Sequence, residues 1–201
     1  MISKLKSVSA LALMATLSGA LASGGCASMK ERAVVAEQSR ENNPGPCPRA
    51  FAIYEASRSV EFRGNAQRYA NVGFTAEMSG VRSLCRYYGS APINADLEID
   101  MAFGRGPAAA GEASHTYNYF VAVTRKNIAV IEKQYFPITV TFPEGVSVME
   151  TTERLESIVI PRAKETTSGA NFEIIVGYEL TPAQKEFNEA GKRFRVSAGA
   201  N

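Results

Sequence analysis

The sequence predicts an all-β protein, an antiparallel immunoglobulin-like β-sandwich of about seven strands with a short C-terminal helix. Apolar and polar residues alternate along most of the chain after residue 50, and turn-forming residues separate the alternating segments. Alternation with a period of two places one face of each strand in a core and the other in water, which is typical of antiparallel sheets. A closed barrel is the alternative arrangement for such strands.

The alternating segments define the expected strands. They lie near residues 50–62, 71–88, 93–103, 115–125, 127–142, 153–160 and 171–180. The third segment has the clearest pattern, in which Asp96, Glu98 and Asp100 alternate with Leu97, Ile99, Met101 and Phe103. In the fifth segment the apolar residues of one parity, all expected to face the core, are Ile128, Val130, Phe136, Ile138, Val140 and Phe142.

Three local signals refine this outline. Arg125-Lys126-Asn127 predicts a tight hairpin turn, because Asn tolerates a positive φ. The apolar parity changes after Gly80, which predicts a β-bulge at that residue. Thr181-Pro182-Ala183-Gln184 combines an N-cap, a proline at the first helical position and a capping box. We therefore expect a helix that packs Phe187 on the sandwich and ends at Gly191.

Residues 1–25 have the three zones of a secretory signal peptide. Lys4 and Lys6 form a positive start, residues 8–21 form an apolar run too short for a comfortable membrane span, and small residues follow. Two cleavage sites compete. Ala20-Leu21-Ala22 fits the A-x-A pattern of ordinary signal peptidase. Gly25-Cys26 resembles the lipobox of bacterial lipoproteins, although Ser23 stands where that motif usually has an apolar residue.

The cysteine count favours lipidation of Cys26. The chain has three cysteines, and an unpaired one is a reactive liability in an oxidising compartment. If Cys26 carries lipid, Cys47 and Cys85 remain as a disulfide pair, and their spacing fits neither a redox CxxC motif nor a zinc cluster. The alternative is a soluble periplasmic protein with an unmodified Cys26. Ala27 differs from the Asp that resembles an inner-membrane retention signal, which favours an outer-membrane lipoprotein facing the periplasm.

The expected domain organisation follows from these features. It comprises a signal peptide at 1–25, a lipid-anchored tether at 26–46, a β-sandwich at 47–190 and a flexible tail at 191–201. A tether of about twenty residues reaches at most roughly 65–70 Å, which keeps the domain near the membrane. Without Lys4 and Lys6 the 22 basic residues fall to 20, equal to the 20 acidic residues, so the net charge does not favour nucleic acid or anionic lipid as a charge-driven partner.

No motif assigns a catalytic residue, a metal site or a cofactor. His115 is the only histidine, and Ser114 beside it points to the opposite face if both lie on a strand. No G-x-S-x-G motif is present, so we expect His115 to be an exposed residue at a strand start. Tyrosines that could stack on sugar rings or fill a partner's pocket form a candidate binding surface, with structural packing as the competing interpretation. They are Tyr87, Tyr88, Tyr117, Tyr119 and Tyr135.

Several segments together resemble a group of small envelope lipoproteins from alpha-type proteobacteria with no established activity. The segments are Cys47-Pro48, Cys85, Arg105-Gly106-Pro107, Tyr119-Phe120-Val121-Ala122-Val123 and Gly177-Tyr178-Glu179-Leu180-Thr181. This resemblance spans most of residues 47–185, implies a lipoprotein and supplies no mechanism. We therefore expect a non-enzymatic binding or accessory module, whose partner is an envelope protein or a cell-wall polymer. The alternatives are an envelope hydrolase and a purely structural surface protein.

Overall fold

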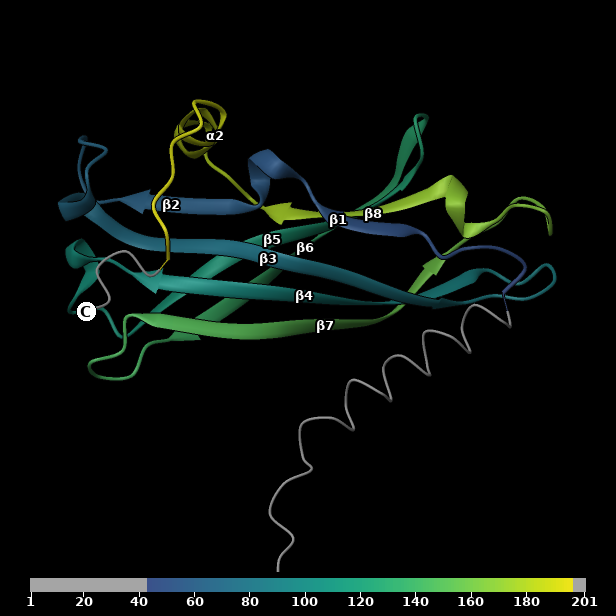
Figure 1. Ribbon diagram of the computed structural model, residues 1–201, viewed down its shortest axis with the longest axis horizontal. Helices are drawn as coiled ribbons and strands as arrows, with labels where there is room; N and C mark the ends of the chain where they lie inside the picture. Colours follow the sequence, from purple (N-terminus) through teal and green to yellow (C-terminus); the bar gives the residue numbers. More distant parts are fainter. Residues whose placement is uncertain (1–42, 197–201) are drawn as a thin grey trace, which may run out of the picture.

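Alternating apolar side chains form eight strands in two four-stranded sheets in the computed structural model, which describes residues 43–196 (Figure 1). The first sheet contains, in spatial order, β1 (Arg49–Ala52), β8 (Phe172–Tyr178), β5 (Ser114–Arg125) and β6 (Ala129–Thr141). The second contains β2 (Arg58–Phe62), β3 (Val72–Arg86), β4 (Ile93–Arg105) and β7 (Val148–Ile160). Only β1 and β8 pair in parallel. The predicted all-β sandwich is confirmed.

Short helices connect the strands and cover one side of the sandwich. They are the 3-10 helices η1 (Tyr54–Ala56), η2 (Tyr69–Asn71), η3 (Pro107–Ala109) and η4 (Gly169–Asn171), and the α-helix α2 (Pro182–Glu189). Helix α2 begins with the predicted capping box between Thr181 and Gln184. Within residues 43–196, no helix has both the length and the apolar character needed to cross a membrane.

The prediction of one strand at 50–62 is wrong. This segment forms two strands, β1 and β2, which belong to different sheets. Helix η1 separates the two strands and turns the chain from one sheet to the other. The amide of Ile53 still donates to the carbonyl oxygen of Val176 in the first sheet, at 3.0 Å. The amide of Met78 in the second sheet donates to the carbonyl oxygen of Ser57, at 2.8 Å. A sequence pattern of period two does not show this change of sheet.

The core lies between the inward faces of the two sheets, and most of the predicted inward residues form it. The residues with an exposed fraction of 6% or less include Val72, Phe74, Ala76, Met78, Leu97, Ile99, Met101, Phe103, Phe172, Ile174, Val176 and Tyr178. The predicted bulge is also confirmed, because the β3–β4 register shifts between Met78 and Gly80. Asn127 has the positive φ expected for the hairpin turn, at 58°.

Two predicted core residues, Ile128 and Val130, are instead exposed, at 69% and 61%. The register of the β5–β6 pair shifts between Val123 and Thr124, so the parity of β6 changes near its start. The hairpin also extends outward from the body of the sandwich (Figure 1). The expectation that these two residues face the core was therefore wrong.

The N-terminal end of the described chain is held by the predicted Cys47–Cys85 disulfide. Asn43 adds a second attachment, because its amide donates to the carbonyl oxygen of Cys85 at 3.0 Å and its side-chain oxygen accepts from the amide of Tyr87 at 2.9 Å. A Cβ at Gly169 would overlap the carbonyl oxygen of Pro46, so only glycine allows this close approach. The packed domain thus begins at residue 43, four residues before the predicted boundary. The predicted signal peptide, Cys26 and most of the tether lie outside the described residues.

The C-terminal boundary predicted at residue 190 is too early. Phe194 packs beyond α2, with ring centroids 6.1 Å from Phe187 and 5.9 Å from Phe62. The carbonyl oxygen of Val196 lies against Gly104 so closely that a Cβ there would overlap it. These contacts form a small second apolar cluster, separate from the core between the sheets. Residues 197–201 of the predicted flexible tail lie outside the described chain.

We expect the double substitution of Cys47 and Cys85 by Ala to lower the free energy of unfolding by roughly 4 kcal/mol in the chain-entropy account of disulfides. The bond joins residues separated by 38 positions, so it restricts a long loop of the unfolded chain. Denaturant unfolding followed by circular dichroism measures the change. Cys26→Ala is the matched control and should leave the unfolding free energy unchanged. An unchanged midpoint in the double variant would contradict the prediction.

We expect Phe194→Ala to lower the unfolding free energy by about 1–2 kcal/mol, because it removes a partly buried ring from the second cluster. The neighbouring Arg193 is exposed, so Arg193→Ala should change stability by no more than about 0.5 kcal/mol. Thermal unfolding of the two variants makes the comparison. Equal melting temperatures would mean that the chain after residue 190 does not contribute to the domain.

Candidate functional site

The five tyrosines of the predicted binding surface do not form one surface, so that prediction is wrong. Tyr117 and Tyr119 point into the core from β5, with the hydroxyl of Tyr117 donating to the carbonyl oxygen of Thr75 at 3.1 Å. Burial raises the pKa of both phenols well above the usual value. Their inward position follows from the parity of β5, because the alternation of a strand places every second residue in the core.

The other three tyrosines lie apart from one another. Tyr87 is buried beside the disulfide, where its hydroxyl donates to the carbonyl oxygen of Pro46 at 3.0 Å. Tyr88 follows β3 in the second sheet and is 82% exposed, whereas Tyr135 lies on β6 in the first sheet and is 53% exposed. Tyr87, Tyr88 and Tyr135 therefore do not form a common binding site.

His115 lies at the start of β5, as predicted, but it is half-buried and not exposed. Its ring stacks on Phe74 with centroids 4.1 Å apart, and its Nε2 lies 3.3 Å from a carboxylate oxygen of Glu61. Arg63 contacts the same Glu61 carboxylate at 2.8 Å and that of Glu112 at 3.0 Å. Because β5 and β2 belong to different sheets, this cluster links the two sheets at one end of the sandwich.

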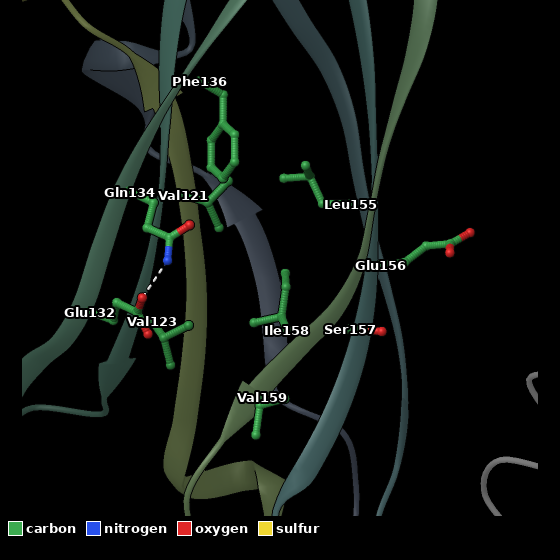
Figure 2. Close-up of a pocket in the computed structure, with 10 residues that line it drawn as sticks. All are labelled: Val121, Val123, Glu132, Gln134, Phe136, Leu155, Glu156, Ser157, Ile158 and Val159. Carbon is green, nitrogen blue, oxygen red and sulfur yellow. Dashed lines mark hydrogen bonds between the residues drawn. The ribbon is translucent and has the colours of Figure 1, made fainter.

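A groove opens along the side of the sandwich where β6 and β7 lie. These strands are the last of their respective sheets, and neither has a further neighbouring strand among the described residues. The groove contains a cavity of about 360 Å³ between them (Figure 2). Its lining residues are Val121, Val123, Glu132, Gln134, Phe136, Leu155, Glu156, Ser157, Ile158 and Val159. The apolar members converge on the opening, whereas Glu156 points away from it (Figure 2).

The sequence of β6 leaves this side of the core open. Glu132 and Gln134 pair with Val123 and Val121 of β5, so they occupy positions of the inward parity. The amide of Gln134 donates to a carboxylate oxygen of Glu132 (Figure 2). Two polar side chains therefore stand where apolar ones would close the gap between the sheets. In the sequence, the open side of the core is indicated only by the interruption of the apolar series between Val130 and Phe136.

The opposite wall is shaped by a bulge in β7. Ser157 has a positive φ of 63°, which is uncommon for a residue other than glycine. The β4–β7 register shifts between Ala95 and Leu97, opposite this residue. The amide of Ser157 donates to a carboxylate oxygen of Asp96 at 3.1 Å, which holds the bulge in place. The bulge redirects the following side chains, so that both Leu155 and Ile158 line the groove.

The inner side of the groove carries negative charge without a matching cation. Glu153 of β7 pairs with Ile99 of β4, so it faces inward, and it accepts a hydrogen bond from the hydroxyl of Tyr119 at 3.4 Å. Over the described part of the chain, no basic group lies within 4.0 Å of the carboxylates of Glu132 or Glu153. A cation of a molecule bound in the groove would therefore meet the carboxylate of Glu132 beside the apolar lining residues; Glu153 is not among those residues.

The groove provides carboxylates, an amide and a hydroxyl, but His115 is not among its lining residues. Nowhere in residues 43–196 do three or more His, Cys, Asp or Glu side chains gather in a group able to hold a metal ion. The arrangement is suited to non-covalent binding of an apolar and basic group.

No family model, curated protein or solved structure matches this chain. The resemblance to small envelope lipoproteins therefore stays a prediction from the quoted segments.

We expect the free energy of unfolding to decrease as the pH falls below about 6.5, with His115 as one contributor. Burial lowers the pKa of His115 below its ordinary value of 6.5; Glu61 and Glu112 oppose this effect and Arg63 adds to it. The unfolded chain then takes up a proton at a higher pH than the folded protein does, so stability present above pH 6.5 is lost as the pH falls. Denaturant unfolding between pH 8 and pH 5, for the wild type and His115→Asn, measures the effect. The variant should show a flatter profile, and parallel profiles would contradict the prediction.

Proposed function

We propose that the protein is a non-enzymatic binding module of the bacterial cell envelope, held near the membrane by lipid on Cys26. In this proposal it binds an extended segment of another envelope protein in the groove between β6 and β7. The observation that carries the proposal is the apolar groove flanked by β6 and β7, neither of which has a further neighbouring strand within residues 43–196. An unpaired edge offers backbone hydrogen bonds to an added strand.

On the opposite side of the sandwich, the chain covers a strand edge with its own residues. Helix α2 lies over β2 and η1, where the amide of Asn188 donates to the carbonyl oxygens of Glu55 and Arg58, each at 2.8 Å. Gln184 also donates to the carbonyl oxygen of Val60, at 3.1 Å. The corresponding edges at β6 and β7 have no such cover in the described chain.

Strand β6 is the better edge for an added strand. Beyond the register shift near Ile131 it pairs regularly with β5 from Glu132 to Thr141, and only Pro137 in this stretch lacks the amide hydrogen that pairing requires. Strand β7 is interrupted beside the groove by the bulge at Ser157. A segment paired with β6 would extend the first sheet across the opening and direct alternate side chains into the groove.

The lining of the groove indicates the chemistry of this segment. Apolar side chains would contact Val121, Leu155 and Ile158, while a Lys or Arg would meet Glu132. A cavity of about 360 Å³ is near the lower end of the usual ligand range of roughly 300–1,000 Å³, which suits a few side chains. We therefore propose a partner segment in which apolar and basic residues alternate.

Site-specific photo-cross-linking in cells tests the proposal. A photoreactive phenylalanine at position 134 lies in the groove, whereas one at Thr152 lies on β7 away from its lining residues. We expect one abundant adduct from position 134 that is absent from position 152, with the cross-linked partner peptide alternating apolar and basic residues. Adding Glu132→Lys should lower the adduct yield by about tenfold or more, because like charges then face each other.

Glu150→Lys is the matched charge control, because Glu150 is exposed on β7, pairs with Ala102 and does not line the groove. It should leave the adduct from position 134 unchanged. Equal adducts from positions 134 and 152, or no adduct from position 134 in folded protein, would contradict the proposed function.

A further inference from the structure

The tip of the β5–β6 hairpin is an exposed apolar surface unlike the rest of the molecule. Its aliphatic residues Ile128, Val130 and Ile131 are 69%, 61% and 42% exposed. They lie within four consecutive positions, and the hairpin extends away from the sandwich (Figure 1). Three clustered aliphatic side chains on a convex tip indicate an interaction surface, because single exposed apolar residues are common but contiguous ones are not.

The tip is also held in one conformation. Asn127 takes the positive φ of 58° that closes the turn, and the amide of Ile128 donates to the carbonyl oxygen of Arg125 at 3.0 Å. The amide of Lys126 donates to the carbonyl oxygen of Asn171 at the end of η4, at 2.9 Å. The aliphatic side chains are therefore presented without a large loss of conformational freedom on binding.

Cations lie within the turn and further along β6. Arg125 and Lys126 precede the aliphatic residues and are exposed. Neither has a carboxylate within 4.0 Å over the part of the chain that the structure describes. Lys133 follows on β6, with its ammonium 4.9 Å from the ring centre of the exposed Tyr135. Aliphatic side chains interspersed with cations, and a tyrosine further along β6, suit the surface of an anionic bilayer.

The hairpin lies at the end of the sandwich where the described chain begins. Lys126 bonds to η4, and Gly169 of η4 lies against Pro46, close to Asn43. Residues 1–42 precede this point, so a membrane attachment within them would join the domain at this end. The position of the tip thus suits a second contact with the same membrane.

We propose that the β5–β6 hairpin tip inserts into the surface of an anionic lipid bilayer. Ile128, Val130 and Ile131 enter the boundary between headgroups and acyl chains, and Arg125, Lys126 and Lys133 contact lipid phosphates. A lipid surface fits better than a protein pocket, because the hairpin protrudes from the sandwich and carries Arg125 and Lys126 in its turn, while the first acidic residue, Glu132, follows the aliphatic ones (Figure 1). A second membrane contact of this kind, beside the proposed lipid on Cys26, would strengthen attachment and orient the domain.

A tryptophan placed at the tip tests this directly, because the chain has no tryptophan of its own. The full chain with Cys26→Ala and Ile128→Trp is mixed with vesicles of phosphatidylcholine containing phosphatidylglycerol. We expect Trp emission to shift to shorter wavelength and to be quenched by brominated acyl chains. Adding Arg125→Gln and Lys126→Gln should weaken the binding seen by this shift, by about fivefold for each cation removed.

The matched control carries Glu144→Trp with the same Cys26→Ala. Glu144 is exposed in the turn between β6 and β7, at the other end of β6. Attachment through residues 1–42 affects both proteins equally, so only the difference between the two reporters supports insertion of the tip. No shift at position 128, an equal shift at position 144, or an equal shift on vesicles of phosphatidylcholine alone would overturn the proposal.

Discussion

Packing of the two sheets against each other is the interaction on which the rest of this structure depends. Each sheet buries one face, and residues such as Ile99, Phe103 and Ile174 are completely covered between them. Because the sheets are open and not closed into a barrel, the same packing leaves two sides at which strand edges end. The chain covers one side with η1 and α2, and the other side carries the groove between β6 and β7.

The open side combines features that oppose indiscriminate pairing with features that suit a selected partner. Glu132 faces inward on an edge strand, Pro137 removes one backbone donor, and the bulge at Ser157 interrupts the facing edge. Inward charges, prolines and bulges all discourage edge-to-edge aggregation of identical chains. A partner strand with a cation opposite Glu132 would escape that penalty, so the same residues give selectivity. The two proposals share β6, whose inward face lines the groove while its beginning forms the exposed tip.

Part of the candidate site was present in the sequence but could not be interpreted there. The polar residues Glu132 and Gln134 interrupt an apolar series, yet an interruption at the edge of a strand pattern also marks a turn or a solvated strand. The tyrosines were a more conspicuous sequence feature, but they predicted a binding surface that the structure does not form. Aromatic residues favour strands, and β5 directs Tyr117 and Tyr119 into the core. His115 was similarly placed on the correct strand, but its stacking on Phe74 depends on a strand of the other sheet.

By itself, the sequence determined the local structure and the pairing of the cysteines. Alternation identified most strands, Gly80 and Asn127 marked the bulge and the turn, and Thr181 to Gln184 marked the start of α2. These features depend on residues close together in the chain, so their physical causes can be read locally. Only the tertiary structure decided which strands become edges, how the chain changes sheets after β1, and that Phe194 packs on the domain. Those outcomes depend on contacts between distant segments, and strand order, which creates the groove, has no local signature in the sequence.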